Sequence, residues 1–150
     1  MEIRRALASD YGGVCKIRTL TIGGEYFQKT FEDEIQNTDY VFIVAQQAAQ
    51  IWGYGILELT PPEASVIEVA VRPESQGQGL GKTVLKHLLE EAGAKNCCDF
   101  FLEVRESNWR AQKLYVSAGF VLLSRRKAYY KNPEEDALMF CLRYAVDPPA

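Results

Sequence analysis

A glycine-rich turn between a strand-like run and a helix-like run could bind phosphate groups. The segment Val69–Thr83 reads VAVRPESQGQGLGKT and places Gly77, Gly79 and Gly81 directly before a helical pattern. Backbone N–H groups at a helix N-terminus have no partner within the helix and lie at the positive end of its dipole. Glycines let the main chain approach a ligand closely. The turn therefore predicts a diphosphate site formed mainly by backbone amides.

Three phosphate-binding motifs compete for this turn, and the spacing of their residues separates them. A Walker loop matches the letters GKT but needs glycine where the chain has Gln76. The dinucleotide fingerprint begins at Gly77 but meets Lys82 in place of its third glycine. The pattern that is complete is Gln76-x-x-Gly79-x-Gly81. Because so short a pattern is weakly specific, a purely structural glycine turn stays open as an alternative.

A second pattern lies downstream, where a strand-like run is followed by a helix-like run. The segment Leu102–Phe120 reads LEVRESNWRAQKLYVSAGF and contains N-x-x-A-x-x-L-Y-x-x-x-G-F. Asn108 and Tyr115 are seven positions apart in it, which on a helix is nearly two turns and about 10.5 Å along one face. One extended ligand could therefore contact both side chains.

Together, the two patterns resemble the pyrophosphate loop and the second motif of the GNAT family of N-acetyltransferases. Within that family, the run Leu102–Asn108 and the later segment Arg126–Ala137 look most like the RimI-type ribosomal protein alanine N-acetyltransferases. The resemblance is good over roughly residues 64–144 and holds for the N-terminal third only in pattern. It implies one GNAT domain over residues 1–150, acetyl-CoA as the acetyl donor, direct transfer to a primary amine, and no metal.

The resemblance also implies which residues bind the cofactor. The glycine turn would hold the pyrophosphate, and a pantetheine arm beside the second helix would meet Asn108. A backbone N–H of the strand Val69–Val71 would stabilise the oxyanion that forms during transfer. The residues predicted to bind acetyl-CoA are Val69, Ala70, Val71, Gln76, Gly77, Gln78, Gly79, Leu80, Gly81, Lys82, Thr83 and Asn108.

By the same resemblance, Glu103 is the general base and Tyr115 the general acid. An amine must lose its proton before it can attack, so a carboxylate must accept that proton directly or through water. An N-terminal amine has an unperturbed pKa of about 7.7–8.0, against about 10.4 for lysine, and is easier to deprotonate. A phenol with a pKa of about 10 can protonate a departing thiolate with a pKa of about 8.5 if it is well placed.

Each of these roles has a structural alternative. Glu103 could be a solvated carboxylate at a strand end, and Tyr115 could be a packing residue of its helix. Glu68 is the rival base and a predicted substrate contact, because it lies on the cofactor strand with its neighbours Ile67 and Val69 facing the other way. The other predicted substrate contacts, which could equally form an ordinary amphipathic strand, are Arg126, Tyr129 and Tyr130.

The acceptor is less well defined than the cofactor. RimI-like sequences usually carry P-W-S before the second helix, whereas this chain has GEYFQKTF over Gly24–Phe31. The predicted acceptor is the N-terminal α-amine of a protein, ribosomal proteins included. A small-molecule amine or a lysine is the alternative. A non-catalytic acetyl-CoA-binding regulatory module is a third interpretation, and the presence of both Glu103 and Tyr115 argues against it.

The elements that would position these groups follow from periodicity and turn residues. Helices are predicted from Ser9 or Asp10 to about Leu20, over Glu25–Asn37, from the glycine turn to Gly93, and over Asn108–Ala118. Strands are predicted over Glu2–Arg5, Tyr40–Gln46, Ile51–Leu59, Ser65–Val71, Asp99–Arg105, Val121–Tyr129 and Ala137–Tyr144, with a loose tail over 146–150. This order predicts a mixed α/β sheet. The family fold implies six to seven mostly antiparallel strands flanked by about four helices.

Composition narrows the function further. A net charge of −3 and a pI near 5.3 lack the basic field of a nucleic-acid-binding protein, so we expect no nucleic-acid partner. No apolar run reaches the length of a signal peptide core or a membrane span, which predicts a cytoplasmic protein without a membrane partner. Both a monomer and a homodimer remain open. The four cysteines form no C-x-x-C pair and His87 is the only histidine, so we expect reduced thiols and no histidine-based zinc site.

Overall fold

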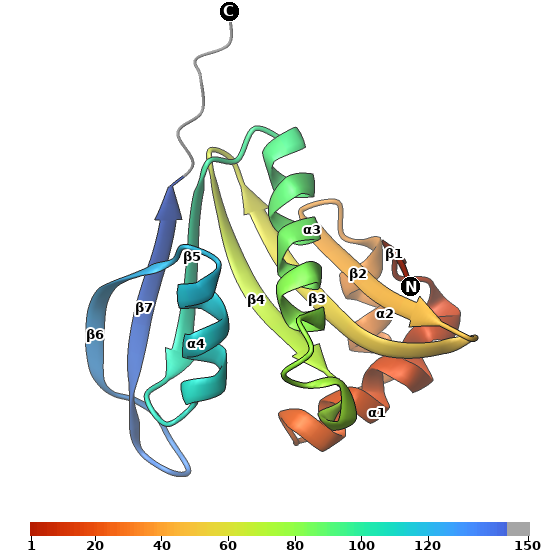
Figure 1. Ribbon diagram of the computed structural model, residues 1–150, viewed down its shortest axis with the longest axis horizontal. Helices are drawn as coiled ribbons and strands as arrows, with labels where there is room; N and C mark the ends of the chain where they lie inside the picture. The colour runs from red at the N-terminus through yellow and green to blue at the C-terminus, as the bar shows by residue number, and fades with distance from the viewer. Residues whose placement is uncertain (144–150) are drawn as a thin grey trace, which may run out of the picture.

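A seven-stranded sheet forms the centre of the protein in the computed structural model, which describes residues 1–143 (Figure 1). Its strands are β1 (Glu2–Arg5), β2 (Tyr40–Gln47), β3 (Gln50–Thr60), β4 (Glu63–Val71), β5 (Asp99–Arg105), β6 (Val121–Tyr130) and β7 (Glu135–Arg143). They lie in the order β1-β2-β3-β4-β5-β7-β6, and all neighbours are antiparallel except β4 and β5. The predicted mixed, mostly antiparallel sheet is confirmed.

Helices cover both faces of this sheet. Within residues 1–143 they are α1 (Tyr11–Thr21), α2 (Gln28–Gln36), α3 (Leu80–Ala94) and α4 (Trp109–Ser117). α3 and α4 pack on one face, where Leu85 and Leu88 are fully buried (Figure 1). α1 and α2 pack on the other face, where Ile17 and Phe31 are fully buried. The strand β2, second from one edge of the sheet, is apolar on both faces because each face meets a helix layer.

Most elements lie within two residues of their predicted bounds, but α2 begins three residues later than the predicted helix Glu25–Asn37. The preceding Gly23 and Gly24 have left-handed φ angles of 79° and 80° and turn the chain instead. Tyr26 lies outside the helix but packs edge-on against Phe31, with ring centroids 6.3 Å apart. The helical spacing of these two aromatic residues therefore reflects a shared core rather than a shared helix.

The start of α1 differs from the prediction in its capping contact. Asp10 is the N-cap residue, but its side chain makes no capping hydrogen bond to the helix. Its carboxylate instead accepts hydrogen bonds from the Arg4 guanidinium at 2.8 and 2.9 Å and from the Leu7 N–H at 2.7 Å. Burial by itself would raise the pKa of Asp10, but these hydrogen bonds outweigh it and lower that pKa. Asp10 therefore ties β1 to the start of α1.

Several smaller predictions concern the ends of the chain and its thiols. Cys15, Cys97, Cys98 and Cys141 are free, as predicted. His87 is exposed on α3. Tyr144, predicted as the end of the last strand, and the predicted tail over 146–150 lie outside the described residues.

β4 and β5 pair at only one end. The parallel register joins Glu63–Ser65 to Asp99–Phe101, and no further pair between these strands is present in the described part of the chain. Beyond that point the two strands diverge, with α3 lying over β4 and α4 over β5 (Figure 1). A bulge in β4 lies just past the last paired residue, between Val66 and Glu68. Because a bulge bends and twists the strand that carries it, we attribute the gap between β4 and β5 to this irregularity.

Gly55 lets α3 pack closely on the sheet. A Cβ at this position would lie 2.7 Å from Leu88 Cδ1 and 2.8 Å from Val84 Cγ1. We expect Gly55→Ala to lower the free energy of unfolding by about 1–3 kcal/mol through overpacking, measured by urea denaturation. Gly12→Ala on α1 is the matched control, because no atom lies within 4 Å of its added Cβ. If the two variants unfolded at the same urea concentration, the close-packing explanation would be wrong.

Candidate active site

The predicted phosphate-binding turn connects β4 to α3. A 3₁₀ turn over Pro73–Ser75 follows β4, and the chain then passes through Gly77 and Gly79, whose φ angles of 79° and 87° are left-handed. Only glycine adopts such angles readily. Gly79 is the N-cap residue of α3 and has no side chain to satisfy the first N–H groups of the helix. The N-terminus of α3 therefore fits an anionic group.

Side chains around the turn hold it against its neighbours. Arg110 of α4 donates a hydrogen bond to Oε1 of Gln76. A Cβ on Gly81 would lie 3.5 Å from Leu114 of α4, so the start of α3 lies against that helix. The Thr83 hydroxyl donates to the Gly79 carbonyl at 3.0 Å. The predicted cofactor residues that line a cavity of about 260 Å³ beside this turn are Gln78, Gly79, Leu80 and Thr83.

β4 presents backbone N–H groups to the gap. The Arg72 N–H donates to the Trp52 carbonyl of β3 at 2.9 Å. Because backbone groups alternate in direction along a strand, the N–H groups of Val69 and Val71 point away from β3 and toward the gap. The Ala70 side chain packs into the core on the α1 side, while Val69 packs on the α3 side. The gap thus carries backbone donors of the kind that can bind a carbonyl or an oxyanion.

Tyr115 approaches the gap from α4. Its ring is 7 % exposed and packs edge-on against Phe120, with centroids 5.7 Å apart. Burial and the negative charge of Glu68 raise the pKa of Tyr115 well above its ordinary value. The phenol therefore stays protonated at neutral pH.

The bulge in β4 brings Glu68 level with Glu103 of β5. Ser65 pairs with Phe101, so an unbroken register would place Glu68 opposite Val104 and facing α3. The bulge adds one residue before Glu68, so Glu68 comes opposite Glu103 of β5 instead of Val104. Both carboxylates therefore flank the gap on the face covered by α1 and α2. The α3-side core supports this assignment, since it contains Val66, Val69, Leu102 and Val104.

The two apolar neighbours of Glu68 lie in different surroundings. Val69 packs into the α3-side core, as the alternation of a strand predicts. Ile67 is the extra residue of the bulge, is 51 % exposed and packs in neither core. The predicted alternation is therefore broken at Ile67, because a bulge interrupts it.

Glu103 lies beside the predicted substrate contacts Arg126, Tyr129 and Tyr130. Its side chain is 30 % exposed, against 11 % for Glu68, and its Oε1 lies 3.9 Å from Nη1 of Arg126. The Arg126 guanidinium lies 5.6 Å from the Tyr129 ring centroid, and Tyr129 packs edge-on against Tyr130 at 5.2 Å. Burial and the charge of Glu103 raise the pKa of Tyr130. These three predicted substrate contacts thus form one cluster next to Glu103.

Arg18 of α1 is a residue of this region that the sequence motifs do not reveal. Its Nη1 lies 2.7 Å from both carboxylate oxygens of Glu68, and its guanidinium lies 4.6 Å from the Tyr26 ring centroid. The Tyr26 hydroxyl donates to Glu34 of α2 at 2.6 Å. In the sequence, Arg18 is marked only as a basic residue directly after the apolar Ile17 of the predicted first helix.

Asn108 caps α4. Its Oδ1 accepts a hydrogen bond from the Ala111 N–H at 3.2 Å, which holds the first turn of the helix. The sequence motif assigns Asn108 a contact with the cofactor, and the cap is a second role that the motif did not indicate. The cofactor contact stays a prediction.

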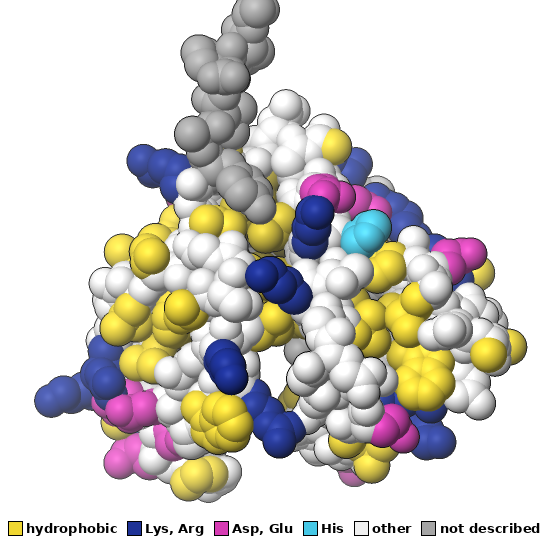
Figure 2. Space-filling view, in the orientation of Figure 1, with side chains coloured by type: hydrophobic (Ala, Val, Ile, Leu, Met, Phe, Trp, Pro, Cys, Tyr) yellow, Lys and Arg dark blue, Asp and Glu magenta, His cyan; other side chains and the backbone are white. Residues whose placement is uncertain are grey.

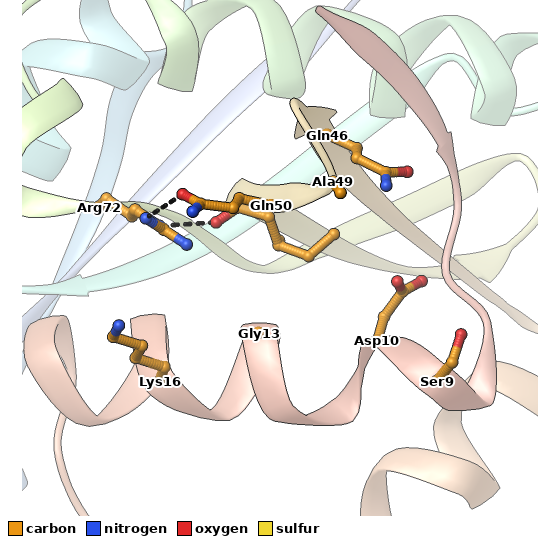
Figure 3. Close-up of a pocket in the computed structure, with 9 residues that line it drawn as sticks. Ser9, Asp10, Gly13, Lys16, Gln46, Ala49, Gln50 and Arg72 are labelled. Atoms are coloured by element: carbon orange, nitrogen blue, oxygen red, sulfur yellow. Dashed lines mark hydrogen bonds between the residues drawn. The ribbon is translucent and has the colours of Figure 1, made fainter.

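A separate cavity of about 350 Å³ lies between α1 and the β2–β3 hairpin (Figure 3). Arg72 donates hydrogen bonds across its wall to the Ile51 carbonyl at 2.7 Å and to Gln50 Oε1 at 3.2 Å. These contacts anchor the end of β4 directly before the glycine turn. Neither Glu103 nor Tyr115 lines this cavity.

Comparison with known proteins identifies this arrangement. Residues 4–120 match the Acetyltransferase (GNAT) family. The chain belongs to this family. The [ribosomal protein bS18]-alanine N-acetyltransferase of Escherichia coli K12 is 34% identical to it over 117 residues, which are 77% of this chain and 78% of that protein.

Solved structures of other proteins share this fold. The crystal structure of the ribosomal-protein-S18-alanine N-acetyltransferase from Escherichia coli matches with a TM-score of 0.86 at 29% identity, over 98% of this chain and 96% of that one. yncA of Salmonella typhimurium, whose structure holds acetyl-CoA, matches with a TM-score of 0.82 at 19% identity, over 100% and 98%. This GNAT protein is therefore an acetyl-CoA-dependent N-acetyltransferase, as the sequence predicts.

The residues of the GNAT site fit acetyl-CoA. The open N-terminus of α3 suits the diphosphate, and the added-Cβ positions of Gly77 and Gly79 meet no atom within 4 Å, so the turn is open to a ligand. The molecule is hollowed between the half that carries α3 and the half that carries α4 (Figure 2). Among residues 1–143, no helix is long and apolar enough to cross a bilayer, and no three His, Cys, Asp or Glu side chains are grouped to hold a metal ion.

Proposed function

We propose that this acetyltransferase modifies the N-terminal α-amine of a protein, ribosomal proteins included. The observation that carries the proposal is its 34% identity to an Escherichia coli enzyme named for acetylating an alanine of ribosomal protein bS18. The gap supports transfer to an amine, because it would let an acceptor approach from the α1 and α2 face while the donor bound on the α3 and α4 face. In this proposal residues 1–150 are one GNAT domain that acts in the cytoplasm, as a monomer or a homodimer.

The backbone of the glycine turn and of β4 holds the donor in this proposal. The N–H groups at the start of α3 bind its diphosphate, and the N–H groups of Val69 and Val71 bind the acyl arm and its carbonyl oxygen. Asn108 contacts the arm from the start of α4. When bound, acetyl-CoA supplies the acetyl thioester. The predicted cofactor residues are otherwise those of the turn itself, which are Gln76, Gly77, Gln78, Gly79, Leu80, Gly81, Lys82 and Thr83.

Two side chains move protons in this proposal. Glu103 accepts a proton from the acceptor ammonium, directly or through water, and so exposes the nitrogen lone pair. Tyr115 donates its hydroxyl proton to the departing thiolate. Burial raises the pKa of Tyr115, so the phenol is protonated at the start of the reaction, as a donor must be. Arg126, Tyr129 and Tyr130 line the acceptor side next to Glu103.

Mass spectrometry of candidate acceptors tests the proposal. The enzyme and acetyl-CoA are incubated with peptides that begin with alanine, with the same peptides blocked at the N-terminus and carrying an internal lysine, and with polyamines. We expect one acetyl group on the free α-amine and none on the blocked peptides. Acetylation confined to polyamines or lysine would overturn the protein N-terminus as acceptor. Absence of thiol release with every acceptor would overturn catalysis itself.

A further inference from the structure

Two carboxylates flank the gap on its acceptor side, and each has an arginine beside it. Glu68 is paired with Arg18 and Glu103 lies near Arg126. We propose that Glu68 and Glu103 together bind the acceptor ammonium before it is deprotonated, and that Arg18 is a positioning residue that holds Glu68 for this task. The proposal rests on the proposed transfer to an amine and adds a recognition step to it.

The contact between Arg18 and Glu68 is not the arrangement expected of a purely structural ion pair. Arginine and a carboxylate commonly form two parallel N–H···O bonds from two different nitrogens. Here a single nitrogen, Nη1, contacts both oxygens of Glu68 at 2.7 Å. Within residues 1–143, the buried Nε of Arg18 has no hydrogen-bond partner. The Tyr54 hydroxyl also acts on Glu68 and, like Arg18, opposes the rise in its pKa that burial causes. Because a carboxylate accepts about four hydrogen bonds, Glu68 can still accept one from a further donor in addition to those from Arg18 and Tyr54.

The position of Glu68 makes those lone pairs reachable from the gap. It lies level with Glu103 across the gap, on the face of the sheet opposite α3 and α4. Burial and the charge of Glu68 raise the pKa of Tyr115, the phenol that protonates the thiolate in the proposed reaction. An ammonium group has three donors and can contact both carboxylates at once. Such binding places the nitrogen beside the proposed base and near the proposed acid.

Arg18 is the only cation among the groups that act on Glu68 in the described chain. Burial raises the pKa of Glu68, and the Arg18 cation opposes this rise. Without Arg18, the pKa of Glu68 would rise further and the carboxylate would lose its charge at a higher pH. The charged and titratable groups around Glu68 are Arg18 of α1, Tyr26 before α2, Glu34 of α2, Tyr54 of β3, Tyr115 of α4 and Glu103 of β5.

The first test is Glu68→Gln, which keeps the size of the side chain and removes its charge. We expect the KM for the amine acceptor to rise about tenfold or more, the effect of losing a hydrogen bond between charged groups. The KM for acetyl-CoA should stay within about twofold, which also shows that the variant is folded. The inhibition constant of the des-amino acceptor, in which hydrogen replaces the ammonium, should not change. Glu91→Gln, which alters the exposed Arg5–Glu91 pair, is the matched control and should match wild type.

The second test separates positioning from simple structural support. Arg18→Gln should shift the acidic limb of the pH profile of kcat/KM to higher pH, and Arg18→Lys, which keeps the charge, should restore it. If Arg18 only tied α1 to β4, Arg18→Gln would lower the melting temperature without moving this limb. The proposal would be overturned if the acidic limb did not move in Arg18→Gln. It would also be overturned if Glu68→Gln left the amine KM unchanged, or raised it only in parallel with the des-amino inhibition constant.

These outcomes are distinct from failure of the proposed acceptor. The wild-type enzyme is first screened with peptides and polyamines, and the variants are then compared with whichever amine reacts. Peptides that fail to react overturn the protein N-terminus as acceptor. The amine KM in Glu68→Gln still decides whether Glu68 recognises the ammonium.

Discussion

Glu103→Gln is expected to lower kcat for the acceptor by about a hundredfold or more at neutral pH. Glutamine keeps the shape of the side chain but cannot accept the ammonium proton, and removal of a general base typically costs this much. The loss should shrink as the pH rises past about 8, because an N-terminal amine is then largely deprotonated in solution. Steady-state kinetics across this pH range measure both effects with one acceptor peptide.

Glu106→Gln is the matched control for this variant. Glu106 lies three positions along the chain, is exposed and pairs with Arg125 instead of facing the gap. We expect its kcat to equal that of wild type. A Glu103→Gln variant with normal kcat, or with a defect of the same size at every pH, would show that Glu103 is not the base.

Tyr115→Phe is expected to lower kcat by about a hundredfold while the KM for acetyl-CoA stays within about twofold. Phenylalanine keeps the edge-on packing against Phe120 and removes only the hydroxyl that protonates the thiolate in the proposed reaction. Because burial and the Glu68 charge raise the pKa of Tyr115, the wild-type phenol stays protonated through neutral and mildly basic pH. The acid should therefore impose no basic limb on kcat below the ordinary tyrosine pKa of about 10.

Tyr40→Phe controls for loss of a tyrosine hydroxyl elsewhere. Tyr40 starts β2 and packs against the core on the α1 and α2 side, away from Tyr115 on α4. Its kcat should match wild type. Full activity in Tyr115→Phe would leave Tyr115 with packing as its only role, which is the structural alternative considered from the sequence.

The glycine turn and the helices α3 and α4 could be predicted from sequence because their signals are local. The glycines of the turn, the apolar spacing of α3 and the run from Asn108 to Phe120 each lie within one short segment. The acceptor side depends on contacts between distant segments. Arg18 and Glu68 are 50 positions apart, and nothing in the residues between them indicates that they meet.

The bulge in β4, and so the register of this strand, could not be predicted from the sequence either. The run Ser65–Val71 alternates and carries β-branched residues like an ordinary strand, and no glycine or proline marks the bulge. The pairing of β3 with β4 fixes it, and that pairing exists only in the folded sheet. The start of α2 was predicted too early for a related reason. Tyr26 and Phe31 pack in one core, and their helical spacing in the sequence does not show that only Phe31 lies in the helix.

The extra residue Ile67 in β4 determines whether a gap between β4 and β5 connects the two faces of the sheet. If Ile67 were deleted, side chains would alternate regularly along β4 and Glu68 would still face the acceptor side. However, β4 would lose the local bend that separates it from β5. The parallel pairing of β4 with β5 could then continue toward Val71 and Arg105. A continuous sheet would in that case keep the donor and the acceptor on opposite sides. In the proposed reaction, the unpaired stretch of β4 and β5 is what lets a thioester on one side of the sheet meet an amine nitrogen on the other.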